Sequence, residues 1–499
     1  MNLYDAYKPF RNKVKEFDLE KSLIGIWHYA NHVVDDIPLP NKAWYYNDGY
    51  SYRSPKEIIF PWQLEIALKE IILNYNVNGK VYIDRFQNLS FLINGIQNTI
   101  NTADGTSINQ SNIFYAAFRL LHQQALWQAG YPFRSMMRHY EIFKHPSLSA
   151  LLVEKYGLNT IEIFTIAHLM LVNIKRSPYI DPNTDYTEIG IPKELSSNLL
   201  NALTDNIIYS SHRIKLDQEY DHSWAYTRNH IRDYPLIKLG NGKIICPFPT
   251  LFLKRLTDSL YYDLVKLDGF SNPYGQAYEN HIFNTITKLI PSNYEIKKET
   301  PYTVTKKNRK LGFDALIGSK DTCLLIECKT YRAPLEAKSS LGGDKFSVVT
   351  DRLSDAVVQA CKNVKDIHDG FTEWDLSNRK IVVFIITLDP WFTDFPDIIS
   401  DLNSQAMSKL ELMKFDLELY SNIDYYICSA DQFEKFCHVV SQVGLDNFFE
   451  NTDSKAHSIN NALYSVYASH GNHFPFAKIF GLIDALKERV DPYFDETQF

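Results

Sequence analysis

The clearest hydrophobic pattern lies near the middle of the chain, where two apolar runs flank a short polar turn. The runs cover residues 310–317 and 322–330, and residues 318–321 read Gly-Ser-Lys-Asp, which are turn formers. Apolar runs of this length between turn residues are typical of buried strands. The pattern therefore predicts two neighbouring β-strands joined by a tight turn.

Both strands carry charged residues that a buried strand should lack. Asp314 interrupts the first strand, and Glu327 and Lys329 stand at the end of the second. Since successive side chains of a strand point to opposite faces, Leu325, Glu327 and Lys329 share one face. Charged groups in an apolar sheet cost free energy unless they are paired or bind a metal ion. We therefore expect these charges to serve either a structural ion pair or a functional site.

The patterns on either side of the two strands predict the rest of a small α/β core. Residues 274–290 and 350–367 have amphipathic helical patterns. Residues 294–304 are expected to form a strand before the central pair, and residues 380–388 form a fully buried strand after the second helix. Residues 422–428 predict one more strand. The expected order of the core is thus helix, three strands, helix, strand.

The predicted secondary structure divides the whole chain into four expected segments. Residues 1–210 are mostly helical, and residues 211–272 form a connector with a β-hairpin at Asn241-Gly242. Residues 273–390 contain the core, and residues 391–499 form a mixed α/β extension. The fold class is therefore α+β or α/β, with a helical N-terminal domain ahead of the sheet.

Composition is typical of a soluble globular protein with several domains. The 499 residues are 45% hydrophobic and 22% charged, and the six cysteines contain no CxxC pair. The N-terminus lacks the apolar segment of a signal peptide, and no apolar run has the length needed to cross a bilayer. We therefore expect a cytoplasmic protein with reduced cysteines and no membrane contact.

The charge distribution limits nucleic-acid binding to a local surface. A net charge of −7 argues against a chain coated with phosphate-binding residues. A basic cluster nevertheless crowds the hairpin between the first two core strands, with Lys306, Lys307, Arg309 and Lys310 as its members. This cluster either contacts nucleic acid beside the acidic site or is simply a solvated hairpin.

An Asp followed thirteen positions later by Glu-x-Lys, within this order of elements, resembles the PD-(D/E)xK nuclease superfamily. The residues are Asp314, Glu327, Cys328 and Lys329, and the resemblance covers about a quarter of the chain. Phe313 stands where the motif has its proline, a position that varies across the superfamily. The resemblance implies a restriction-endonuclease-like αβββαβ core.

The resemblance also implies roles for these residues in metal-dependent phosphodiester hydrolysis. Asp314, Glu327 and the backbone carbonyl of Cys328 would hold Mg²⁺, for which Mn²⁺ can substitute. Lys329 would orient the attacking water or stabilise the pentacoordinate phosphate. Glu279 on the first helix either supports the metal and its waters or is a surface glutamate.

Gln359 on the second helix is a further candidate, because some relatives carry a glutamine near the scissile strand. Those relatives often place a tyrosine four positions later, where this chain has Asn363. Gln359 is therefore either a contributor to the site or an uninvolved helix residue.

The expected function is a metal-dependent phosphodiesterase, and by analogy of fold a DNA endonuclease of a bacterial restriction or antiphage defence system. An RNA-cleaving effector and a catalytically silent sensor or binding protein of the same fold stay open as alternatives. Residues 1–210 are expected to recognise a protein partner, an activator or the substrate. A homo-oligomer is also left open.

Alanine substitution separates the site from a structural ion pair. Asp314→Ala, Glu327→Ala and Lys329→Ala should each abolish cleavage while folding stays near normal, since each removes a polar group that a metal site uses. The checks are nuclease activity and circular dichroism on the same samples. Loss of solubility in all three variants would instead indicate a buried structural ion pair.

Overall fold

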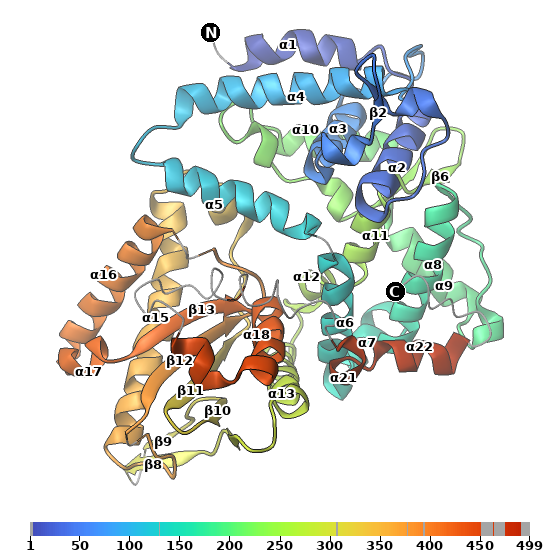
Figure 1. Ribbon diagram of the computed structural model, residues 1–499. Helices are drawn as coiled ribbons and strands as arrows, with labels where there is room; N and C mark the ends of the chain where they lie inside the picture. The colour runs from blue at the N-terminus through green and yellow to red at the C-terminus, as the bar shows by residue number, and fades with distance from the viewer. Residues whose placement is uncertain are drawn as a thin grey trace. The chain divides into compact units, whose positions relative to one another are not determined.

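The computed structural model describes residues 3–128, 130–305, 308–376, 378–392, 395–450, 463 and 475–490. The chain is of mixed α and β type and splits into two compact units (Figure 1). Unit 1 comprises Met1–Gln110, Gln123–Phe270 and Asp484–Phe499, and unit 2 comprises Ser111–His122 and Ser271–Ile483. The expectation of a mixed α+β fold with a helical N-terminal part is confirmed.

Unit 1 is built mainly of helices. Its helices are α1 (Leu3–Val14), α2 (Leu19–Asp35), α3 (Pro61–Leu73), α4 (Phe86–Ser107), α6 (Tyr131–Phe143), α7 (Pro146–Tyr156), α8 (Thr160–Arg176), α9 (Lys193–Ala202), α10 (Ile207–Asp217), α11 (Pro249–Arg255), α12 (Leu260–Leu264) and most of α22 (Leu482–Val490). Among the described residues no single helix is long and apolar enough to span a membrane, although α7 and α8 together, bent by 66°, pass the same test.

Small β-elements complete unit 1. They are the ribbon of β1 (Tyr46–Asn47) and β2 (Tyr52–Arg53) and a sheet in the order β3 (Tyr179–Ile180), β6 (Ile244–Ile245), β5 (Leu236–Lys238), β4 (Thr204–Asn206). β5 and β6 pair antiparallel. Gly242 between them has φ +85°, which a residue with a side chain rarely adopts. The hairpin expected at Asn241-Gly242 is therefore confirmed.

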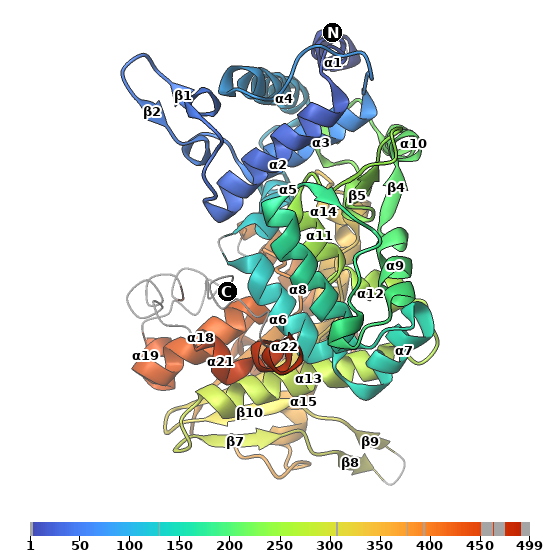
Figure 2. The same cartoon turned by 90° about the vertical axis from the view of Figure 1, so that its right-hand side faces the viewer.

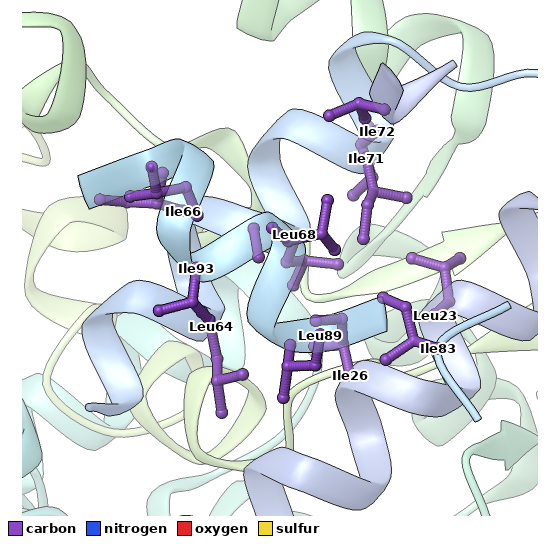
Figure 3. Close-up of a cluster of buried hydrophobic side chains, with 14 of the residues drawn as sticks. Leu23, Ile26, Leu64, Ile66, Leu68, Ile71, Ile72, Ile83, Leu89 and Ile93 are labelled. Carbon is purple, nitrogen blue, oxygen red and sulfur yellow. The ribbon is translucent and has the colours of Figure 1, made fainter. Parts of the chain in front are cut away.

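The core of unit 1 lies where α2, α3 and α4 meet. Figure 3 shows the buried leucine and isoleucine side chains that these helices contribute. α2 begins after Asp18, whose side chain accepts a hydrogen bond from the Lys21 N–H at 2.8 Å. Gly25 on α2 lies against Ile83, and a Cβ at Gly25 would stand 2.3 Å from the Ile83 carbonyl oxygen. This close approach requires a glycine.

Unit 2 is organised around one five-stranded sheet. Its strands run in the order β13 (Asp424–Ser429), β12 (Lys380–Thr387), β11 (Thr322–Lys329), β10 (Ala315–Gly318) and β7 (Glu295–Lys298). β7, β10 and β11 pair antiparallel, whereas β11, β12 and β13 pair parallel. The sheet is therefore mixed, with β11 joining its antiparallel and parallel halves.

Helices cover both faces of this sheet. On one face, Leu325 of β11 and Ile385 of β12 pack with Leu353 of α15 (Asp344–His368) and Leu402 of α16 (Pro396–Leu412). α13 (Ser271–Leu289) and α18 (Ala430–Val443) contact strands of the sheet and each other. Figure 2 shows α13 alongside β10 and β7. A sheet buried on both faces explains why β11 and β12 are almost wholly apolar.

The remaining helices of unit 2 are short or peripheral. They are α14 (Leu335–Lys338), α17 (Leu417–Ser421), α19 (Leu445–Glu450), α21 (Phe476–Ile479) and most of α5 (Ile113–Gln124). α5 joins this unit through aromatic packing, because Tyr115 and Phe118 meet Phe346 of α15 at ring distances of 4.8 and 5.0 Å.

Most of the expected core elements are confirmed. The patterns at 274–290, 322–330, 350–367, 380–388 and 422–428 correspond to α13, β11, α15, β12 and β13. The six cysteines are all buried, as expected for core residues.

The first two core strands differ from expectation, because each is broken in two. β8 (Tyr302–Thr305) and β9 (Asn308–Lys310) leave the sheet and pair with each other as a separate ribbon, which projects in Figure 2. The break follows Thr300, where Pro301 has no N–H to donate to a ladder. Only the segments at 295–298 and 315–318 stay in the sheet.

A pair of glycine substitutions tests the packing of α2. Gly25→Ala should destabilise the protein by about 1–3 kcal/mol, because the new Cβ overlaps backbone atoms. Gly105→Ala on α4 is the matched control, since no atom lies within 4 Å of its Cβ position and helix propensity favours alanine by about 1 kcal/mol. Urea unfolding monitored by circular dichroism measures both. Equal stability of the two variants would contradict the packing at Gly25.

Candidate active site

Three carboxylates stand side by side at the end of the antiparallel half of the sheet. The pairing continues one residue past β10, because the Asp314 N–H donates to the Ile326 carbonyl at 2.9 Å and the Glu299 N–H donates to the Asp314 carbonyl at 3.0 Å. Since Ala315 stands opposite Ile326, Asp314 comes opposite Glu327. Glu299, Asp314 and Glu327 therefore form one row across three strands.

The alternation of β11 places Lys329 on the same face as Glu327. Leu325, two residues earlier, packs into the core beneath α15, so Glu327 and Lys329 continue that face to the strand end. The Lys329 Nζ donates to Glu327 Oε1 at 2.6 Å and to Gln359 Oε1 of α15 at 2.9 Å. The ammonium group is thus held between a strand carboxylate and a helix amide.

Glu327 is a buried carboxylate with one unsatisfied oxygen. The residue is only 4% exposed, and its Oε2 has no hydrogen-bond partner among the described residues. Burial raises the pKa of Glu327, although Lys329 acts in the opposite direction. A buried oxygen without a partner costs free energy, so this atom needs a proton or a cation.

Asp314 is also held in an environment that disfavours its charge. Its Oδ2 accepts a hydrogen bond from the Cys328 N–H at 2.5 Å. Burial and the negative charge of Glu327 raise the pKa of Asp314 to about 8, with smaller contributions from Glu279 and Glu299. Like-charged groups that share a site in this way favour binding of a positive ion.

Glu279 on α13 and Glu299 after β7 extend the acidic cluster. Both are partly exposed, and burial raises the pKa of each. The charges of Glu279 and Glu327 raise the pKa of Glu299 further, whereas Lys298 lowers the pKa of both glutamates. Glu279 was expected near the site from the sequence, but Glu299 was not. The only signal for Glu299 in the sequence is an acidic residue within the strand expected over 294–304.

The donor set fits a divalent cation that prefers oxygen ligands. Asp314 and Glu327 supply carboxylate oxygens. Glu327 Oε2 is a buried acceptor without a hydrogen-bond donor among the described residues. Mg²⁺ usually keeps several waters, so one or two protein carboxylates suffice. Across the described ranges, no group of three or more His, Cys, Asp or Glu side chains is arranged as a complete metal site.

The Cys328 side chain is not a candidate thiolate ligand. It alternates away from Glu327 and Lys329 and is buried. Burial raises its pKa well above the usual value, and the charges of Asp314 and Glu327 add to that effect. A hydrogen bond to the Asp314 side chain raises the pKa further, so the thiol stays protonated.

Two of the four basic residues expected at the hairpin, Arg309 and Lys310, lie on β9 in the described part of the chain. Lys310 Nζ donates to Asp366 of α15 at 2.6 Å, and Tyr302 donates its hydroxyl to the same carboxylate oxygen. Arg309 is exposed on β9, whereas Lys306 and Lys307 lie outside the described residues. Lys310 thus already has an acidic partner.

Comparison of the sequence with models of known protein families and with curated proteins finds no match. In the structure Lys329 contacts Glu327 and Gln359, and Glu279 lies near enough to raise the pKa of Asp314.

Replacement of Asp314 tests whether burial and the neighbouring carboxylates disfavour its ionised form. A carboxyl whose folded-state pKa is raised from 3.8 to about 8 stabilises the fold at low pH and loses that stability as pH rises through about 8. In EDTA, Asp314→Asn should therefore be more stable than wild type by roughly 1–3 kcal/mol near pH 9 and by much less near pH 5. The asparagine oxygen can still accept the Cys328 N–H.

Thermal unfolding across that pH range measures the difference. Asp369→Asn is the control, because Lys365 lowers the pKa of Asp369 at the surface. Its removal should leave stability unchanged or slightly reduced at both pH values. A fall in Asp314→Asn stability at high pH would contradict the like-charge cluster.

Proposed function

We propose that this chain is a metal-dependent phosphodiesterase, and specifically a DNA endonuclease of a restriction or antiphage defence system. The proposal is carried by one observation: Lys329 donates hydrogen bonds to both Glu327 and Gln359, and Asp314 stands opposite Glu327 in the sheet. The buried, unpaired Oε2 of Glu327 supports a cation there. The element order α13, β7, β10, β11, α15, β12 also agrees with a restriction-endonuclease-like αβββαβ core.

Asp314, Glu327 and the backbone carbonyl of Cys328 are the groups that would hold Mg²⁺ or Mn²⁺. When bound, such an ion lowers the pKa of a coordinated water and neutralises charge on the scissile phosphate. Glu279 and Glu299 lie near enough to affect the pKa of Asp314, so they add to the negative potential that attracts the ion.

Lys329 is the group that would act on the phosphate itself. Glu327 and Gln359 accept two of the three hydrogen bonds that its ammonium can donate. The third N–H is thus left to contact a phosphate oxygen or the attacking water, and the preformed contacts reduce the entropy lost in positioning it. Water attacks phosphorus, the bond from phosphorus to the leaving oxygen breaks, and that oxygen takes a proton.

Gln359 contributes as a positioning residue in this scheme. It lies on α15, the helix that covers the catalytic face of the sheet, and its amide oxygen accepts from Lys329. A neutral amide orients the ammonium without adding to the acidic cluster. Because all these residues lie in unit 2, we propose that unit 1 recognises a partner, an activator or part of the substrate.

The test is cleavage of supercoiled plasmid, linear duplex, single-stranded DNA and total RNA with Mg²⁺, Mn²⁺ or EDTA. Wild type should cleave DNA only with metal, and Lys329→Ala should lose about 100-fold or more of the rate. The matched control is Lys380→Ala, which removes a lysine that pairs with Asp424 at the other end of the parallel strands and should keep full activity.

Each result has a defined meaning. Cleavage of RNA alone would replace the DNA endonuclease with an RNA-cleaving effector that uses the same residues. Equal activity of Lys329→Ala and Lys380→Ala would contradict the catalytic role of Lys329. Inactivity of the wild type on every substrate, also with cell extract added as a source of activator, would contradict the nuclease and favour a binding protein of the same fold.

A further inference from the structure

Unit 2 contains a second feature beside the candidate site, a cavity of about 310 Å³. Its walls come from the residues after β11, from α15 and from the end of β12, and include Lys329, Tyr331, Arg352, Leu353, Thr387 and Trp391. Small-molecule pockets in proteins start at about 300 Å³. The cavity is therefore large enough for a small ligand, and Lys329 belongs to both the cavity and the candidate active site.

Two aromatic rings and the cations of Lys329 and Arg352 line this cavity, together with Asp355, whose carboxylate pairs with Lys409 at 2.6 Å. The rings of Tyr331 and Trp391 lie 5.2 Å apart at 31°, and the Arg352 guanidinium lies 3.9 Å from the centre of the Tyr331 ring. Arg352 is exposed and forms no ion pair with a described residue. Its charge is held over the ring by a cation–π contact and stays available to an anion.

Two buried polar atoms of the aromatic wall lack partners. The hydroxyl of Tyr331 and the indole N–H of Trp391 are both buried without a hydrogen bond to the part of the chain described. Buried aromatic side chains of these types usually find one. Both unsatisfied atoms belong to residues that line the cavity.

One face of α15 connects the cavity to Lys329. Arg352, Ala356 and Gln359 are spaced by four and three residues and so lie along one face of the helix. The first two line the cavity, and Gln359 contacts Lys329. A nucleic-acid strand with one phosphate at Lys329 would therefore place an adjacent nucleotide at the cavity.

We propose that this cavity holds one unpaired nucleotide of the substrate, with its base against Tyr331 and Trp391 and its phosphate near Arg352. The identity of the substrate as a nucleic acid rests on the proposed function. An aromatic surface accepts any base, because every base has a π-face, and arginine adds attraction for the backbone. A paired base cannot enter, so the site selects strands that are single-stranded or locally opened.

The test is fluorescence anisotropy with labelled 20-nucleotide strands of DNA and of RNA, the DNA strand in duplex form, and an abasic DNA strand of equal length. Ca²⁺ replaces Mg²⁺, and gels confirm that the strands stay intact. Wild type should bind a strand with bases about tenfold more tightly than the abasic strand or the duplex. The DNA and RNA arms identify which polymer supplies the nucleotide.

Two variants connect that preference to the cavity. Tyr331→Leu and Arg352→Ala should each weaken binding of the strand with bases by about tenfold and leave abasic binding less affected. Lys365→Ala is the control, because Lys365 lies on the same helix, well away from the cavity face, and pairs with Asp369. Its binding should equal that of wild type.

The outcomes separate this inference from the nuclease proposal. Equal binding of strands with and without bases, unchanged binding by both variants, or no binding at all would overturn the nucleotide cavity, whether or not the plasmid is cleaved. Base-dependent binding that Tyr331→Leu removes would support the cavity even if no metal condition yields cleavage. In that case the nuclease proposal alone would fail.

Discussion

The structure of unit 2 depends on a carboxylate held at the end of an apolar strand. Glu327 is almost fully buried and keeps one oxygen without a partner, so its charge acts strongly on every neighbouring group. It accepts from Lys329, it raises the pKa of Asp314, and it stands opposite Asp314 in the sheet. Lys329 compensates part of this charge, whereas Asp314, Glu279 and Glu299 add to it, so the cluster as a whole favours a bound cation.

The sheet topology determines where that compensation is placed. β11 pairs with β10 on its antiparallel side and with β12 on its parallel side, and Lys329 stands beside Thr387 at the shared end. Residues that follow parallel strands meet at the same edge, which is where α/β sheets bind ligands. The acidic cluster and the aromatic cavity therefore lie next to each other at the ends of β11 and β12.

α15 is the second determinant of the site, because it connects β11 to β12 and covers the same face of the sheet. Its buried side packs Leu353 and Val357 into the core, which orients a neighbouring face toward the strand ends. That face carries Arg352 at the cavity and Gln359 at Lys329. Packing of the apolar side of α15 therefore positions Arg352 and Gln359 on the adjacent face.

The sequence by itself determined the features that depend on neighbours along the chain. Period-two alternation placed Glu327 and Lys329 on one face, and apolar runs located β11, β12 and β13. Only the tertiary structure decided that the two expected strands are each divided, with β8 and β9 forming a separate ribbon. It also decided that Glu299 joins the carboxylate row. The same holds for the cavity that Tyr331 and Trp391 line. These features depend on strand register and helix packing, which join residues far apart in sequence and leave no local periodic signal.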